Sequence, residues 1–124
     1  AALATLNIME RDKFVDHVAN DIGPYLQQKW NGLADHSIVG HVRGVGMLGS
    51  IELVRNKESR ERLEADQKSG GICREFCVAN GLIMRAVGDS MIISPPFVSS
   101  HEEIDLLIAR AKKSLDQTAE HYSV

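Results

Sequence analysis

Apolar residues recur every three or four positions through the first part of the chain, and charged residues lie between them. This spacing places apolar side chains on one face of an α-helix, so it predicts an amphipathic helix from residue 2 to about residue 33. Gly23-Pro24 predicts a kink within this helix, because proline has no backbone N–H to donate to the preceding turn. The apolar positions are Leu3, Leu6, Phe14, Val18, Ile22, Tyr25 and Leu26.

Two later parts of the chain carry β-rich runs on either side of a glycine turn. Residues 38–43 and 47–54 flank Gly44-Val45-Gly46 and predict one β-hairpin. Residues 82–87 and 90–94 flank Gly88-Asp89 and predict a second hairpin. Its last strand is expected to end at Pro95-Pro96, because proline cannot donate a hydrogen bond to a strand ladder.

Two further helices are expected, one before and one after the second hairpin. Asn80-Gly81 closes the earlier helix, since glycine readily adopts the left-handed conformation of a helix C-terminus. The last helix begins at Ser100, whose spacing from Glu103 matches a capping box. The apolar face of the earlier helix contains Ile72, Cys73, Phe76 and Cys77. The apolar stripe of the last helix contains Ile104, Leu107, Ile108, Ala111, Leu115 and Tyr122.

A charged stretch, residues 55–69, separates the first hairpin from the earlier of these two helices. Pairs such as Glu58–Arg62 and Glu64–Lys68 favour an exposed helical turn, and a solvated loop is an equally good interpretation. The complete order is α-β-β-α-β-β-α. This order predicts an α+β fold of the α/β-sandwich kind, with an antiparallel sheet covered by helices.

The length of 124 residues predicts a single domain. The first helix is longer than most helices of globular proteins, which suits a segment that joins two parts of a larger molecule. The chain also begins Ala1-Ala2-Leu3, with neither Met nor a capping side chain. We therefore expect a piece of a longer protein, and a processed N-terminus is the alternative.

Composition and charge narrow the class of partner. The chain has 14 Lys and Arg against 17 Asp and Glu, a net charge of −3, which argues against nucleic acid and anionic membranes as partners. It contains no apolar run long enough to span a membrane and no signal-peptide pattern, so we expect a cytoplasmic protein. Cys73 and Cys77 are too few for a disulfide framework and lack further ligands at metal spacing, which favours buried structural thiols.

Few residues carry a chemical signal. The glycines at 44, 46 and 49 match the G-x-G-x-x-G pattern, but they lead into a strand, so a turn with close backbone packing is favoured over a dinucleotide cradle. Arg85 lies within apolar strand residues and must point either to solvent or to an anionic partner. Strand alternation by itself favours solvent. Arg43 has fewer apolar neighbours and is interpreted as structural.

Three stretches of the chain resemble the C-terminal part of the class III aminotransferases, and especially the omega-amino acid:pyruvate and amine:pyruvate transaminases. These stretches are Val39–Gly49, Gly81–Phe97 and the helix entry Ser100–Asp105. The resemblance covers essentially the whole chain. It implies the small C-terminal domain of a fold type I pyridoxal-phosphate enzyme, with residues 1–34 as the helix that arrives from a missing large domain and residues 35–124 as the small α+β domain.

The same resemblance implies a function for Arg85. In that family the matching arginine binds the substrate carboxylate and swings aside for uncharged amines. The full enzyme is then expected to be a homodimer that uses pyridoxal 5'-phosphate to move an amino group from an amine or omega-amino acid to a 2-oxo acid such as pyruvate.

The family's Schiff-base lysine and its acid beside the pyridine nitrogen both lie upstream of the matching region. No catalytic or cofactor-binding residue is therefore assigned to this chain, and we expect it to be inactive alone. The alternative is an autonomous, non-catalytic α+β module that binds a ligand or oligomerises. A fragment that self-associates through its first helix is a third possibility.

Overall fold

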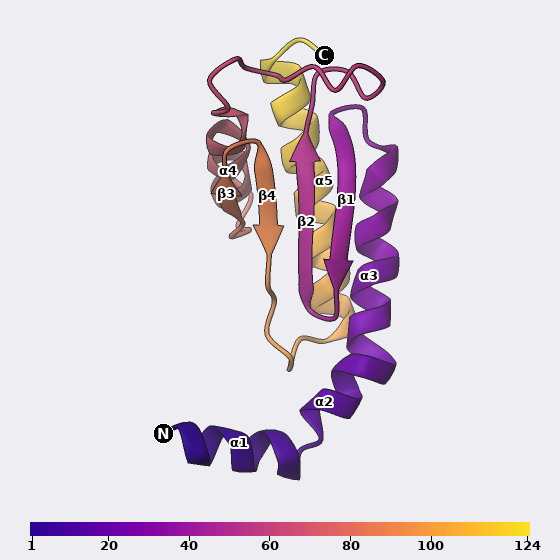
Figure 1. Ribbon diagram of the computed structural model, residues 1–124, viewed down its shortest axis with the longest axis vertical. Helices are drawn as coiled ribbons and strands as arrows, with labels where there is room; N and C mark the ends of the chain where they lie inside the picture. Colours follow the sequence, from indigo (N-terminus) through magenta and orange to yellow (C-terminus); the bar gives the residue numbers. More distant parts are fainter.

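The computed structural model describes all residues, 1–124, and contains a four-stranded sheet with helices packed on one face (Figure 1). The strands are β1 (Val39–Val45), β2 (Leu48–Leu53), β3 (Arg85–Val87) and β4 (Ser90–Ile93). They lie in the order β1-β2-β4-β3, and every neighbouring pair is antiparallel. The predicted α+β fold is confirmed. The two hairpins lie side by side because β2 pairs with β4.

The strand register separates a buried face of the sheet from an open one. Val42, Ile51, Met91 and Ala86 are aligned across the four strands and face the helices. Successive side chains of a strand point to opposite faces. The next aligned row, Arg43, Ser50, Ile92 and Arg85, therefore lies on the other face, which no helix covers (Figure 1).

Three helices form the second layer. α3 (Gly23–Asn31) runs beside β1, α4 (Ser69–Ala79) lies against β3 and β4, and α5 (His101–His121) runs behind the sheet (Figure 1). Their buried residues join those of the sheet in one core. The predicted capping box of α5 is confirmed: the backbone N–H of Glu103 donates to Ser100 Oγ at 3.1 Å, and the backbone N–H of Ser100 donates to Glu103 Oε2 at 2.8 Å.

The glycine-rich hairpin allows α3 to approach the sheet closely. A Cβ atom at Gly49 would lie 2.7 Å from Nε1 of the fully buried Trp30, and one at Gly44 would overlap the side chain of Gln27. The indole N–H of Trp30 donates to the carbonyl of Ser50 at 3.3 Å. The glycines thus permit backbone packing, as predicted. The turn itself lies at Gly46-Met47, because Gly44 and Val45 still belong to β1.

The prediction of one helix over residues 2–33 is wrong, although an irregular turn does precede Gly23-Pro24. The segment comprises α1 (Ala2–Arg11), α2 (Phe14–His17), the π-helix η1 (Val18–Ile22), α3, and the 3₁₀-helix η2 (Gly32–Asp35). The sharp bend occurs at Lys13, which has a left-handed φ of 52°, so α1 runs across the direction of α3 (Figure 1). The wider turn of η1 ends just before Gly23-Pro24 and accommodates the missing proline donor there.

The charged stretch that follows β2 is a loop, so the solvated-loop interpretation is correct. Its only ladder contact is an isolated bridge between Asn56 and Glu61. Several contacts attach it to the rest of the chain, among them the hydrogen bond that Tyr122 Oη donates to Glu64 Oε1 at 2.5 Å and the burial of Leu63 in the core. None of the helices combines the length and apolar character needed to cross a bilayer.

Candidate functional site

Arg85 is the first residue of the edge strand β3, and its side chain lies on the open face of the sheet. Met84 is buried towards the helices, whereas Ile83 and Val87 are 88% and 50% exposed on the same face as Arg85. No acidic side chain of the chain lies within ion-pair distance of the Arg85 guanidinium. The arginine is therefore free to bind an external anion among exposed aliphatic side chains.

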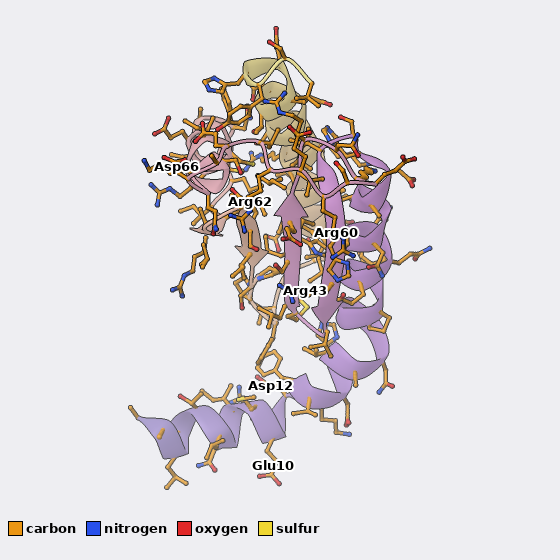
Figure 2. The ribbon with its side chains drawn as sticks, turned by 45° about the horizontal axis from the view of Figure 1, so that its top comes forward. Glu10, Asp12, Arg43, Arg60, Arg62 and Asp66 are labelled. Carbon is orange, nitrogen blue, oxygen red and sulfur yellow. The ribbon has the colours of Figure 1, made fainter.

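A second arginine, Arg43, lies on the same face at the opposite edge of the sheet. It pairs with Ser50, and Ser50 and Ile92 separate it from Arg85 within one aligned row. Three strand spacings amount to about 14 Å between the two backbones. A shallow hollow of about 460 Å³ lies beside Arg43 and is bordered by Leu48 and Ile92. Figure 2 shows Arg43 on the hairpin of β1 and β2.

The turn from β3 to β4 contains a buried carboxylate that the sequence patterns did not single out. Asp89 is 9% exposed and accepts a hydrogen bond from Ser69 Oγ at 2.7 Å. Its other carboxylate oxygen lies 3.8 Å from Nε of Arg62, which comes from the charged loop. The backbone carbonyl of Asp89 accepts from the N–H of Leu53 at 2.9 Å. Since Ser69 is 20 residues away, only the predicted turn at Gly88-Asp89 pointed to this position.

A polar cluster joins α3 to the start of α5 on the helical side of the molecule. Tyr25 Oη donates to Asp105 Oδ1 at 2.7 Å, and Lys29 Nζ lies 3.3 Å from the same oxygen. The rings of Tyr25 and His101 stack with centroids 4.1 Å apart. The hydrogen bond from Tyr25, assisted by Lys29, lowers the pKa of Asp105. The cluster lies across the sheet from Arg85, so we interpret it as a link between helices.

The two cysteines are part of the core, as the sequence predicted. Both thiols are buried, and Cys77 Sγ lies 3.7 Å from Sδ of Met84. The hydrogen bond to Cys77 and burial in the core together raise the pKa of Cys73. No third His, Cys, Asp or Glu joins them to complete a metal site.

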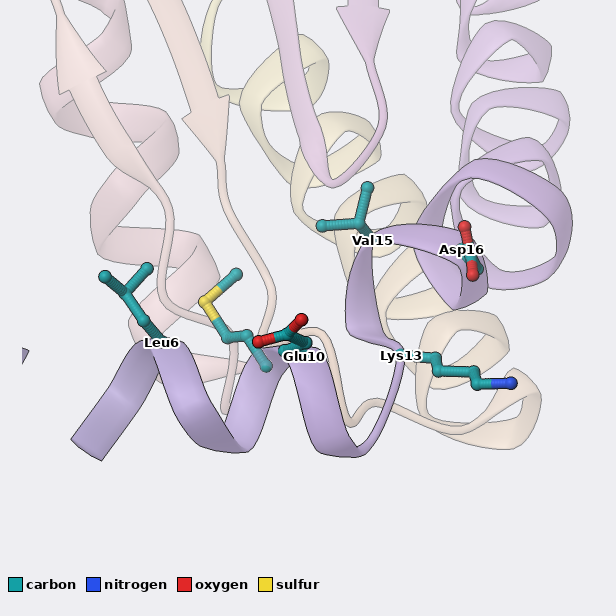
Figure 3. A pocket seen from close by; sticks show the side chains of 6 residues that line it. Leu6, Glu10, Lys13, Val15 and Asp16 are labelled. Atoms are coloured by element: carbon teal, nitrogen blue, oxygen red, sulfur yellow. The ribbon is translucent and has the colours of Figure 1, made fainter. Parts of the chain in front are cut away.

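A hollow of about 420 Å³ lies in the elbow between α1 and α2. Figure 3 shows the apolar side chains of Leu6 and Val15 beside Glu10, Lys13 and Asp16 in this elbow. The hollow follows from the left-handed backbone of Lys13, which turns α1 away from the next helix. No residue of α1 is buried.

The lysines do not form a site for pyridoxal phosphate within this chain. Such a site requires a lysine that forms a Schiff base and an acid beside the pyridine ring. Lys29 and Lys68 pair with Asp105 and Asp66, and Lys57 donates to the carbonyl of Ala34 at 2.6 Å. The other lysines, Lys13, Lys112 and Lys113, are exposed. We therefore assign none of the six lysines to a cofactor site.

Comparison with known proteins places these observations in a family. The family model described as aminotransferase class III matches residues 1–115. A putrescine–pyruvate aminotransferase from Pseudomonas aeruginosa is 53% identical over 118 residues, which cover 95% of this chain and 26% of that protein. A chloroplastic gamma-aminobutyrate transaminase from Solanum lycopersicum is 33% identical over 94% of this chain and 22% of its own length.

A solved structure has the same fold. The omega transaminase from Pseudomonas jessenii, in complex with PMP, is 30% identical with a TM-score of 0.91, covering 98% of this chain and 27% of that one. The chain thus spans about a quarter of the length of the relatives it matches. The alternative of an autonomous module is not favoured by these similarities.

Proposed function

The chain belongs to the class III aminotransferases, which are pyridoxal-phosphate enzymes, and on this basis we propose that it forms the C-terminal small domain of a longer transaminase. The full protein would move an amino group from an amine or omega-amino acid to a 2-oxo acid such as pyruvate. The similarity to a putrescine–pyruvate aminotransferase supports this choice of substrates. The Schiff-base lysine and most cofactor contacts would lie in the part of the protein outside this chain.

The role proposed for Arg85 is to bind the substrate carboxylate. The observation that carries it is the unpaired guanidinium on the open face of the sheet, at the free edge of β3. A guanidinium offers two parallel N–H donors that match the two oxygens of a carboxylate. Ile83 and Val87 on either side would exclude water from this contact and strengthen it.

The same arrangement accounts for uncharged amines. An exposed arginine on an edge strand has room to turn away, since nothing within the chain holds its guanidinium. The aliphatic surface of Ile83, Val87 and Ile92 would then face the alkyl part of an amine. Arg85 would thus distinguish two substrate classes by its position.

The proposed domain organisation follows the same reasoning. Residues 1–34 would connect the small domain, residues 35–124, to a large domain that binds the cofactor. The exposed apolar residues of α1, such as Leu3 and Leu6, support this because they need a covering surface. The bend at Lys13 separates α1 from α3, whose residues Leu26 and Trp30 are fully buried in the core of this chain. We also propose that the full-length enzyme is a homodimer and is located in the cytoplasm.

The experiment compares this chain with the full-length protein. Purified full-length protein should form alanine from pyruvate and a diamine in the presence of pyridoxal phosphate. The isolated chain should form none and should leave the absorbance spectrum of the cofactor unchanged. Alanine formation by the isolated chain, or its absence from well-folded full-length protein, would contradict the proposal.

A further inference from the structure

We propose that Asp89 is a positioning residue for Arg85, because it fastens the turn of the β3–β4 hairpin to α4 and to the charged loop. The inference rests on the proposed function, in which Arg85 binds the substrate carboxylate. Asp89 does not touch the open face itself. It acts through the short strand that carries the arginine.

The strand β3 needs such a fastening. It has three residues, Arg85–Val87, and pairs on one side only, with β4. Short strands at the edge of a sheet open locally more easily than central strands, because fewer backbone hydrogen bonds hold them. Without a further contact, fluctuations of β3 would leave the Arg85 guanidinium without one defined position.

The Asp89 carboxylate supplies this contact at the turn. Ser69, the first residue of α4, is fully buried and donates its hydroxyl to Asp89 Oδ1 at 2.7 Å. The carbonyl of Asp89 accepts from Leu53 of β2 at 2.9 Å. The turn is therefore attached to a helix and to a central strand at the same residue. Hydrogen bonds to a charged group are among the stronger ones in proteins.

The packing of α4 against the turn leaves little room for movement once this bond is made. A Cβ atom at Gly70 would overlap the carbonyl oxygen of Gly88 and lie 3.3 Å from Cβ of Ala86. The start of α4 thus contacts both the turn and β3. Gly88 has a φ of +60°, a conformation that favours glycine. The Ser69–Asp89 bond joins two surfaces that already fit closely.

The charged loop contributes the second partner. Arg62 approaches Asp89 Oδ2 at 3.8 Å and is half exposed, so its attraction is partly screened by water. Figure 2 shows Arg62 and Asp66 on this loop. Ser69 is the buried partner and Arg62 the peripheral one, and loss of Ser69 is therefore expected to have the larger effect.

A more mobile β3 would affect substrate binding through the orientation of the Arg85 guanidinium. Binding of a carboxylate by a guanidinium depends on the direction of both N–H donors, and small displacements of positioning groups reduce rates markedly. A looser β3 would weaken the contact with carboxylate substrates. Uncharged amines, which do not use the guanidinium, would be affected little. A change in this preference separates a positioning role from a general loss of stability.

The test uses the full-length protein and the variant Ser69→Ala. We expect kcat/KM for carboxylate substrates to fall about 3- to 10-fold, mostly through KM, as for loss of one hydrogen bond to a charged group, while kcat/KM for simple amines stays close to wild type. Asp89→Ala should lower further the ratio of kcat/KM for carboxylate substrates to kcat/KM for simple amines. Asp89→Asn should restore part of this ratio, because its side-chain oxygen still accepts from Ser69.

The matched control is Ser114→Ala. Ser114 is also fully buried; its hydroxyl donates to the carbonyl of Arg110 at 2.8 Å and accepts from Asn80 Nδ2, at the far end of α4, at 3.0 Å, but it lies in α5 and forms no hydrogen bond with the β3–β4 turn. This variant should lose stability without a change in substrate preference. Hydrogen exchange of the amides of residues 85–87 should accelerate in Ser69→Ala and not in Ser114→Ala.

Two results would overturn the inference. The first is the same ratio of kcat/KM for carboxylates to kcat/KM for amines in Ser69→Ala and Ser114→Ala. The second is hydrogen exchange of the β3 amides in Ser69→Ala at the wild-type rate. Failure of the proposed function gives a different pattern, in which Arg85→Ala itself leaves the substrate ratio unchanged. If Asp89→Ala does not fold, Ser69→Ala and Asp89→Asn decide the question, because both retain a buried side chain of similar size.

Discussion

Arg43 and Arg85 lie in one row of side chains across the open face of the sheet, at its two opposite edges. Their backbones are about 14 Å apart, and neither guanidinium has an acidic partner within ion-pair distance. Both residues are therefore exposed arginines on the open face of the sheet, but Arg43 lies on β1 and Arg85 on β3. This makes one a matched control for the other.

Replacement of Arg85 with Ala should change substrate preference in the full-length enzyme. We expect kcat/KM for carboxylate substrates to fall by about 2–4 kcal/mol in free energy, as for the loss of a charged hydrogen-bonded partner, with a much smaller effect on simple amines. Arg43→Ala should leave the ratio between the two substrate types unchanged. Equal losses for both types in Arg85→Ala would refute the carboxylate role.

The thiols of Cys73 and Cys77 should be unreactive in the folded chain. Both are buried, so an alkylating reagent does not reach either sulfur atom while the chain is folded. Alkylation with iodoacetamide, followed by mass spectrometry, should modify neither residue in native buffer and both in denaturant. Rapid labelling of the native chain would show that α4 opens readily or that the thiols reach solvent.

Substitution of Gly49 with Ala should destabilise the fold. The new Cβ would lie 2.7 Å from the indole of Trp30 and would push α3 away from the hairpin. Overpacking of this kind costs about 1–3 kcal/mol in the free energy of unfolding, which urea titration of the chain measures.

Gly71→Ala is the control for that substitution. No atom lies within 4 Å of a Cβ at Gly71, and the residue is in α4, where alanine is the better helix former. This variant should be at least as stable as the wild-type chain. Equal destabilisation by the two substitutions would argue against the close packing of Trp30.

Acid should weaken the link between α3 and α5. The hydrogen bond from Tyr25 and the ion pair with Lys29 lower the pKa of Asp105 in the folded chain. A group whose pKa is lower when folded contributes stability above its unfolded pKa of about 4, and this contribution is lost as the pH falls through the folded pKa.

Thermal unfolding between about pH 6 and about pH 3 checks this expectation. The drop in Tm over this range should be smaller in Asp105→Asn than in the wild-type chain, because asparagine does not titrate. Glu102→Gln, a neighbouring substitution of an exposed acid with no partner near Tyr25, should behave like wild type. The same drop in all three proteins would show that Asp105 does not contribute.

Local sequence patterns determined most of the individual elements. The capping box at Ser100 and Glu103 specified where α5 begins, because its two hydrogen bonds lie within one turn of the chain. The alternation around Arg85 correctly predicted a side chain on the exposed face of a strand. The resemblance of three motifs to class III aminotransferases led to the family that the comparisons then showed.

Contacts between distant residues were decided by the tertiary structure. The bond between Ser69 and Asp89 spans 20 residues, and the row from Arg43 to Arg85 exists because β2 pairs with β4 rather than each hairpin standing alone. The spacing of apolar residues along the chain does not show which distant residues form a hydrogen bond or which strands pair. The bend at Lys13 was missed for a related reason: the apolar pattern continues through it, and only the packing of Leu26 and Trp30 fixes where α3 lies. Sequence patterns report the preferences of neighbouring residues, whereas the free energy of packing selects among the arrangements those preferences allow.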